Sequence, residues 1–271
     1  PPPPPPPAPP PPPPAPPPPP PAVRPPTPGL PPPTRDDREL WIRMMEEVVL
    51  AEQVSFDRRI KPEGKVVSFW VVAFFDGSDV AFAGCLYFRW ETESGAVFVR
   101  LACAKARVTP LRGISTPRSE LNAAVLMQRL NWSVMQALED TPPDRLLIGG
   151  DSETTLASRE KACGALGEYA GNRVGETWDL QEKIETVTQV GLQGKGEWYH
   201  LPSKENCADR PSRIDSSVED VGEKSEWQLG KPYIALPFED WPWERHFAAK
   251  KLSETVPREE LACLLYTSDA A

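Results

Sequence analysis

Four carboxylate residues are the strongest candidates for chemistry in this chain of 271 residues. They are Asp76, Glu120, Asp151 and Asp209. Hard oxygen ligands that converge on one point are what magnesium requires in a protein. Taken alone, each of the four is better explained as a helix N-terminal acid or a turn residue than as a metal ligand, so the spacing proves little by itself. The four become a specific pattern only when the predicted fold brings them together.

The segments around these acids predict an α/β fold with a mixed sheet. Apolar, β-branched and aromatic runs predict strands over residues 65–75, 81–90, 96–104, 145–150 and 196–201. Apolar residues at helical spacing predict helices over 36–60, from Thr116-Pro117 to about 138, over 154–184 with a break near 164–175, and from about Asn206. In this order the four acids all fall at the ends of elements. The sheet is therefore expected to bring these ends together.

Both ends of the chain are expected to lie outside the fold. Residues 1–33 hold 25 of the 36 prolines. Proline lacks an amide donor and fixes φ, so this stretch predicts a disordered tail over 1–35 with polyproline II as its default conformation. A protein that reads PxxP motifs is the alternative for this tail. Residues 261–271 fit no predicted element and look like translated vector sequence.

The net charge of −9 counts against a nucleic-acid partner, because phosphate binding normally uses an excess of lysine and arginine. Basic residues nevertheless gather in one short stretch that contains Lys105, Arg107, Arg112 and Arg118. The five cysteines include no CxxC pair, which predicts reduced, mostly buried thiols and neither a disulfide framework nor a zinc site. No apolar run is long enough for a membrane span and no signal peptide is evident, so we expect an intracellular protein without a membrane partner.

Five sequence blocks resemble the ribonuclease H region of Pao-type (BEL/Pao) LTR retrotransposon polyproteins. They are FFDGSDVAFAGCLYFRW, LACAKARVTPLRGISTPRSELNAAVL, LLIGGDSETTLA, GNRVGE and WYHLPSKENCADRPSR. On either side, VSFDRRIKPEG resembles the connector that follows the polymerase, and SEWQLGKPYIALPFEDWP resembles the spacer before the integrase. The resemblance implies a helical connector over 36–64, a ribonuclease H-like domain over 65–215 and a spacer over 216–260.

This resemblance implies a ribonuclease H-like fold, with a mixed five-stranded sheet and flanking helices. It also implies that Asp76, Glu120, Asp151 and Asp209 are the catalytic acids and hold two Mg²⁺ ions, or Mn²⁺ in their place. The implied reaction is hydrolysis of the RNA strand of an RNA/DNA hybrid during reverse transcription, with selection by 2′-hydroxyl contacts and duplex shape. The implied partners are the reverse transcriptase and integrase segments of the same polyprotein, and the implied location is a cytoplasmic particle, with the nucleus as an alternative.

One feature departs from the family pattern. Many ribonucleases H carry a histidine on a loop shortly before the last aspartate, whereas the loop between Pro202 and Asp209 contains none. His200 lies before this loop, in the predicted last strand, and we expect it to be a structural or surface residue. Without the loop histidine, proton transfer or product release is expected to be slower but not absent.

Three other functions are compatible with part of the pattern. A catalytically inactive domain could keep the fold as a structural or interaction module of the polyprotein. A proofreading-type exonuclease would need two acids separated by one residue in the first strand, which Asp76-Gly77-Ser78 does not supply. An aspartic peptidase would need Asp followed by Thr or Ser and then Gly, and neither Asp76-Gly77-Ser78 nor Asp151-Ser152-Glu153 has that order.

Overall fold

The computed structural model describes residues 34–57, 59–110, 113–188, 198–213 and 217–245. Residues 1–33 and 261–271 lie outside the described residues, so the expectations for both tails stay predictions. The chain divides into two compact units, residues 1–44 and 45–271. The sheet and both of its covering layers belong to the second unit.

Helix α1 (Arg35–Ala51) is shorter than the helix predicted over 36–60. At its end, the amides of Glu52 and Gln53 donate to the carbonyls three residues earlier, those of Val49 and Leu50. Bonds of this kind tighten the last turn and end the α-helix. The apolar residues of α1, from Leu40 to Leu50, are exposed in the structure.

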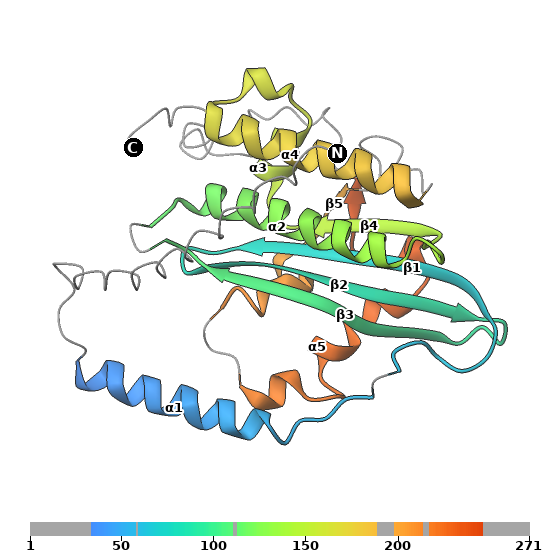
Figure 1. Cartoon of the computed structure of the whole chain (residues 1–271), viewed down its shortest axis with the longest axis horizontal. Helices are drawn as coiled ribbons and strands as arrows, with labels where there is room; N and C mark the ends of the chain where they lie inside the picture. Colours follow the sequence, from blue (N-terminus) through green and yellow to red (C-terminus); the bar gives the residue numbers. More distant parts are fainter. Residues whose placement is uncertain (1–33, 58, 111–112, 189–197, 214–216, 246–271) are drawn as a thin grey trace, which may run out of the picture. The chain divides into compact units, whose positions relative to one another are not determined.

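Six strands form one mixed sheet, in the order β3-β2-β1-β4-β5-β6. Figure 1 labels strands β1 to β5 of this sheet. The six strands are β1 (Val66–Gly77), β2 (Ala81–Thr92), β3 (Val97–Val108), β4 (Arg145–Gly150), β5 (Trp198–His200) and β6 (Glu244–Arg245). The first three form an antiparallel meander, β4 runs parallel to β1, β5 runs parallel to β4, and β6 is antiparallel to β5. The five predicted strands are confirmed, and the two-residue β6 extends the sheet beyond the prediction.

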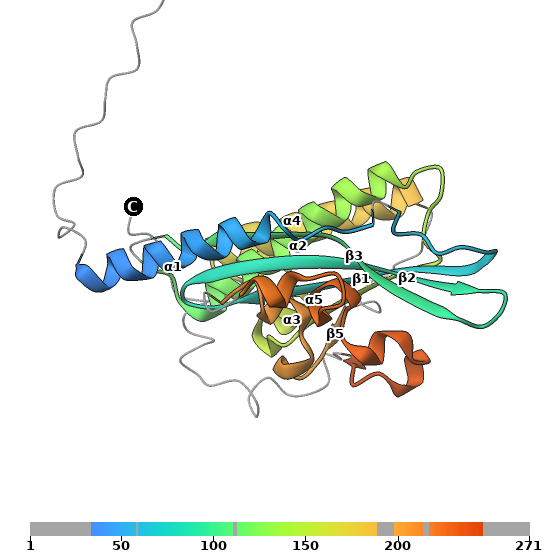
Figure 2. The same cartoon turned by 90° about the horizontal axis from the view of Figure 1, so that it is seen from below.

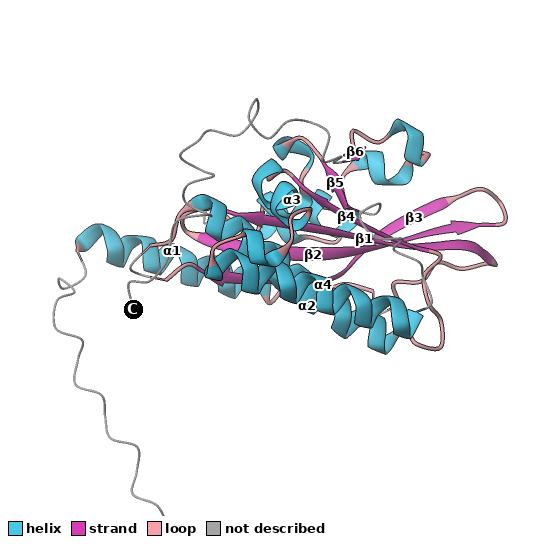
Figure 3. Ribbon diagram, turned by 90° about the horizontal axis from the view of Figure 1, so that it is seen from above, coloured by secondary structure: helices cyan, strands magenta, loops and turns pink. Residues whose placement is uncertain are grey.

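Strand β1 lies in the middle of the sheet and is buried on both faces. Because successive side chains of a strand point to opposite faces, Val71, Ala73 and Phe75 enter one core, and Val72 and Phe74 enter the other. The first core is closed by α2 (Thr116–Ala137) and α4 (Glu168–Thr188), which lie side by side on the same face (Figure 3). Burial of one large apolar side chain stabilises the fold by about 1.5–3 kcal/mol, so the direction of β1 is held from both sides.

The second core is closed by residues 217–243, which include α5 (Glu226–Leu229) and lie against the other face of the sheet (Figure 2). Tyr233, Ile234 and Trp241 are buried there. Arg89, which is 3% exposed, ties this segment to β2 through a hydrogen bond of 2.9 Å from its Nε to the carbonyl of Ile234. The segment falls within the predicted spacer 216–260, whose role in a polyprotein stays a prediction. Its described part packs against the sheet as core.

The helix predicted over 154–184 is two helices, α3 (Glu153–Arg159) and α4. The break lies between Arg159 and Glu168, whereas it was predicted at 164–175, so the two ranges overlap only in part. Gly171 is inside α4, where an added Cβ would meet the carbonyl oxygen of Cys163 at 2.8 Å. This glycine therefore permits close packing of the helix and does not interrupt it.

No α-helix begins near Asn206. The chain forms two short 3₁₀ turns instead, Ser203–Glu205 and Cys207–Asp209. Pro211 explains the difference, because it has no amide hydrogen to donate to the carbonyl of Cys207 and so cannot continue a helix. Asp209 consequently lies at the end of a single tight turn. Helix α2 begins at Thr116, as predicted, and Ser115 occupies its N-cap position.

The four cysteines in the described part of the chain are free. Cys85 and Cys207 are buried, as predicted, and burial raises the pKa of the Cys207 thiol to about 12. Cys103 is partly buried and Cys163 is exposed, so two of these four thiols are buried. Among the helices of the described residues, none is both long and apolar enough to cross a membrane.

The contact between the end of β1 and α2 gives a stability prediction. A Cβ added at Gly77 would clash with the backbone of Ser119 and Glu120, which cannot rotate away. Gly77→Ala is therefore expected to destabilise the protein by about 1–3 kcal/mol, the usual cost of overpacking. Gly164→Ala is the matched control, because an added Cβ there meets nothing within 4 Å. Urea unfolding measures both variants, and an unchanged midpoint for Gly77→Ala would contradict the close approach.

Candidate active site

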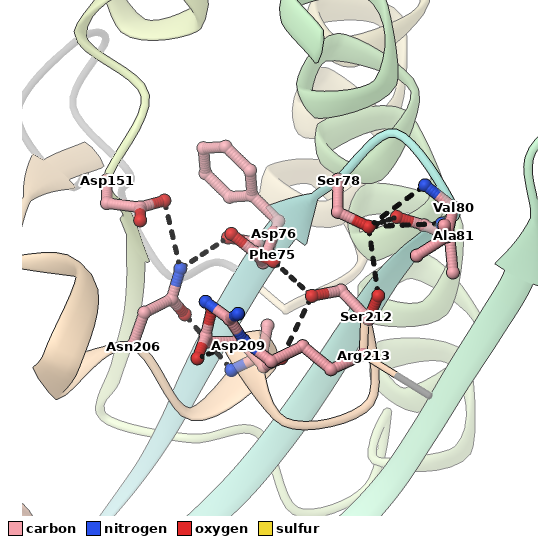
Figure 4. A network of polar contacts seen from close by, with 11 residues as sticks. Phe75, Asp76, Ser78, Val80, Ala81, Asp151, Asn206, Asp209, Ser212 and Arg213 are labelled. Carbon is pink, nitrogen blue, oxygen red and sulfur yellow. Dashed lines mark hydrogen bonds and ion pairs between the residues drawn. The ribbon is translucent and has the colours of Figure 1, made fainter. Parts of the chain in front are cut away.

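The four candidate acids lie at ends of elements, as the sequence predicts. Asp76 is the penultimate residue of β1, Glu120 is in the second turn of α2, and Asp151 directly follows β4. Asp209 is the last residue of the second 3₁₀ turn after β5. Because β1 and β4 are parallel neighbours, their carboxyl ends meet at the same edge of the sheet. Figure 4 shows Asp76, Asp151 and Asp209 in one polar network at this edge.

Asp76 is the most strongly perturbed carboxyl group of the network. It is 8% exposed, and its pKa is raised to about 6, first by burial and then by the negative charges of Asp151 and Asp209. The hydrogen bond that Ser212 donates and the positive charge of Arg213 act in the opposite direction, but they do not cancel the increase. Asp151 and Asp209 therefore lie close enough to Asp76 to disfavour its negative charge.

Asn206 joins the ends of β1 and β4. Its side chain is 2% exposed, and its Nδ2 donates to the carbonyl of Phe75 at 2.9 Å and to Oδ1 of Asp151 at 3.2 Å (Figure 4). Its Oδ1 accepts the amide hydrogen of Ala208 at 3.0 Å, which caps the turn that carries Asp209. One buried amide thus fixes the backbone before Asp76, the carboxylate of Asp151 and the turn before Asp209.

Two side chains that follow Asp209 hold the rest of the network. The hydroxyl of Ser212 donates to Oδ2 of Asp76, and it also lies 2.9 Å from the carbonyl of Asp209. Arg213 makes a bidentate ion pair with Asp209, with nitrogen–oxygen distances of 2.9 and 2.7 Å. Because residues three and four positions apart lie on one face of a helical turn, Ser212 and Arg213 both reach back to the acidic edge.

Glu120 belongs to the same edge through different contacts. Its backbone lies against Gly77, the residue after Asp76. Its carboxylate accepts a hydrogen bond from Ser152, the residue after Asp151. The hydroxyl of Ser152 also caps α3 by accepting the amide hydrogen of Thr155 at 3.1 Å. Glu120 is therefore adjacent to the other acids.

The donor set fits a hard divalent cation in its chemistry, because it consists of carboxylates and includes a buried one whose charge is not fully compensated. In their present positions, however, no three Asp, Glu, His or Cys side chains of the described residues are arranged to hold a metal ion. The carboxylates are bonded instead to Ser212, Asn206, Arg213 and Ser152. Holding a cation requires at least some of these bonds to be exchanged for bonds to the ion.

Sequence reasoning missed Asn206, Ser152, Ser212 and Arg213. The only available signal was the spacing around Asp209, with an amide three residues before it and a hydroxyl and a guanidinium three and four residues after it. His200 lies in β5, as expected, and its Nε2 is 3.2 Å from the backbone carbonyl of Asp151. It therefore contacts the edge of the site through the backbone of an acid and not through its carboxylate.

Comparison with known proteins shows a family match over part of the chain. Residues 32–151 match a family model described as the Pao retrotransposon-like RNaseH-like domain. The matched segment contains Asp76, Glu120 and Asp151 but ends before Asp209. No curated protein matches the chain.

Three solved structures show weak similarity. RNase H1 from the halophilic archaeon Halobacterium salinarum NRC-1 has 15% identity and a TM-score of 0.24, over 42% of this chain and 78% of that chain. The N-terminal RNase H domain of rv2228c from Mycobacterium tuberculosis has 9% identity and a TM-score of 0.30, over 43% and 76%. RuvC from Thermus thermophilus has 14% identity and a TM-score of 0.24, over 54% and 73%.

TM-scores this low do not support a relationship, so the similarity depends on the family match alone. That match includes β1 to β4 and α2, the elements that place three of the four candidate acids. Over residues 32–151, this chain is similar to the family described as the Pao retrotransposon-like RNaseH-like domain.

Proposed function

We propose that this domain is a ribonuclease of the ribonuclease H type, which hydrolyses the RNA strand of an RNA/DNA hybrid during reverse transcription of the retrotransposon. The observation that carries the proposal is the buried Asp76, whose pKa is raised by burial and by the charges of Asp151 and Asp209. A structural aspartate at the end of a central strand gains nothing from two more carboxylates beside it. A cation site does, because the charge of the ion compensates all three.

The four acids have distinct roles in this proposal. Asp76, Asp151 and Asp209 would hold the cations, and Glu120 would join them from α2 after exchange of its hydrogen bond with Ser152. When bound, two Mg²⁺ ions would supply Lewis-acid activation of water and stabilisation of the leaving oxygen. The protein itself would align the acids, because Asn206 and the turn before Asp209 set their directions before substrate arrives.

The direct test is a cleavage assay on a labelled RNA/DNA hybrid with and without Mg²⁺. Asp76→Asn and Asp151→Asn keep the size of the side chain and remove a charged ligand. Loss of an outer-shell contact alone costs about 10- to 100-fold, so each variant is expected to lose at least about 100-fold in cleavage rate. Duplex DNA should stay uncut, because it lacks the 2′-hydroxyl.

Asp179→Asn is the matched control for this assay. It makes the same substitution at an exposed position of α4, away from the acidic edge, and is expected to cleave like the unmodified chain. Cleavage that persists in both active-site variants would show that another nuclease is responsible. A folded chain that cleaves nothing, alone or joined to its polymerase, would support the inactive structural module, and cleavage of a peptide would support the peptidase.

The electrostatics of Asp76 give a second prediction, for the metal-free protein. The folded-state pKa of about 6 exceeds the unfolded value of about 3.9, so the folded state binds the proton more tightly. Protonated Asp76 carries no buried charge, so its electrostatic penalty is absent at low pH. The free energy of unfolding therefore decreases as the pH rises from about 4 through about 6 and Asp76 loses its proton. A difference of about two pKa units corresponds to about 3 kcal/mol, from which a weakened bond to Ser212 removes about 1 kcal/mol.

Asp76→Asn is therefore expected to be more stable than the unmodified chain by about 1–2 kcal/mol at pH 7.5 in a chelating buffer, and not more stable at pH 4. Urea unfolding at several pH values measures this difference. An asparagine variant that is less stable at every pH would show that Asp76 is a favourable structural carboxylate, which would remove the electrostatic basis of the proposed cation site.

A further inference from the structure

Two arginines stack on one tyrosine between helices α2 and α4. The guanidinium carbon of Arg118 lies 4.4 Å from the ring centre of Tyr169, and that of Arg173 lies 3.5 Å from it. Asn122 completes the group, because its Oδ1 accepts hydrogen bonds from the Tyr169 hydroxyl at 3.0 Å and from Nε of Arg173 at 2.6 Å. Two positively charged guanidinium groups thus lie beside one ring, and the side chains that hold them there, Tyr169 and Asn122, are neutral.

Within the described part of the chain, neither guanidinium has an acidic partner. No ion pair to Arg118 or Arg173 occurs among the residues that the structure describes. The Nε atom of Arg118 is buried and has no hydrogen-bond partner there either. Side-chain packing alone does not require this arrangement, because like charges near each other are unfavourable unless an anion is present.

A cavity of about 290 Å³ lies beside this group, and its lining is positively charged. Arg173, Arg129 on α2 and Arg107 at the end of β3 all line it. The one acidic residue in the lining is Glu176, and Arg129 already holds it through two contacts of 2.5 and 3.0 Å. The cavity therefore has a net positive charge in a chain whose net charge is −9.

We propose that this surface, which we call the basic seam, binds the phosphodiester backbone of a nucleic-acid strand. The basic seam consists of Arg107, Arg118, Asn122, Arg129, Tyr169 and Arg173. Arginine is suited to this role, because its planar guanidinium can make bidentate contacts with phosphate oxygens while it stacks on an aromatic ring. The assignment rests on the proposed function for the identity of the polymer, but its geometry is independent of any metal ion.

The position of the basic seam relative to the acidic edge supports this assignment. Arg118 lies two residues before Glu120 in the first turn of α2, and Arg129 lies three turns further along the same helix. At 1.5 Å per residue the two arginines are about 16 Å apart along the axis, the length of about five nucleotides at 3.4 Å each. Helices α2 and α4 lie side by side over this length (Figures 1 and 3). A strand held by the basic seam would therefore begin at the end of α2 that carries a candidate acid.

Binding in the absence of metal tests the inference without cleavage. The full chain is titrated into a labelled RNA/DNA hybrid in EDTA, and fluorescence anisotropy is recorded at several salt concentrations. Arg118→Gln, Arg173→Gln and Arg107→Gln are each expected to weaken binding about 3- to 10-fold and to reduce the slope of log K against log salt by about one. Arg59→Gln is the matched control, because it removes the same charge from an exposed ion pair with Glu63 and is expected to change neither quantity.

The outcomes separate this inference from the proposed function. Unchanged hybrid binding in all three variants would overturn the basic seam even if the unmodified chain cleaves RNA. Lost binding in these variants would support it even if cleavage is absent. Since Arg118 and Arg173 also pack on Tyr169, the thermal midpoint is measured for each variant, and the exposed Arg107 serves as the substitution least able to unfold the chain. Polyglutamate is titrated as a competitor. If it binds the basic seam as tightly as the hybrid does, the basic seam is a site for acidic polypeptides and the proposal is overturned.

Discussion

The carboxyl group of Asp76 is buried at the end of a strand that the fold covers on both faces, and much of the site follows from this placement. Burial makes a charge expensive, and Asp151 and Asp209 add repulsion. The surrounding contacts reduce this cost. Ser212 donates to Asp76, Arg213 pairs with Asp209, and Asn206 donates to Asp151. These three side chains come from one short segment, so its conformation and the electrostatics of the site are coupled.

The rest of the structure keeps this edge rigid. Strand β1 contributes side chains to two cores. Helices α2 and α4 close the first core, and residues 217–243 close the second. The strand therefore cannot shift toward either face without loss of packing. The absence of a side chain at Gly77 lets α2 approach β1 closely enough for Glu120 to lie beside the same edge. Pre-organisation of this kind suits a cation site, because the acids are brought together by apolar packing, which does not depend on the ion.

Much of this arrangement could be predicted from the sequence, because it depends on local patterns. The five main strands follow from β-branched and aromatic runs, and Asp76 and Asp151 follow from the ends of those runs. The predicted helix near Asn206 is a 3₁₀ turn, because Pro211 lacks the amide hydrogen that would continue a helix. The break in the long helical segment lies earlier than predicted, and Gly171 is inside α4, where it permits a close contact with Cys163.

Other features could not be predicted, because they depend on contacts between distant segments. Asn206 is an ordinary polar residue until β1 and β4 are placed beside it, more than 50 residues away in sequence. The core residues Tyr233 and Trp241 lie in a segment without regular apolar periodicity, so its packing against the sheet had no periodic signal. The basic stretch that ends at Arg118 was visible in the sequence, but the stacking of Arg118 and Arg173 on Tyr169 of α4 was not.

The central claim is that the fold gathers these carboxylates to hold divalent cations, and calorimetric titration of the full chain with Mn²⁺ tests it most directly. The account predicts saturable binding to the unmodified chain, equal binding to Asp179→Asn, and an affinity at least about 10-fold lower for Asp76→Asn, because a neutral amide is a weak ligand for a hard cation. Absence of saturable binding to the unmodified chain, or equal affinity for Asp76→Asn, would contradict it.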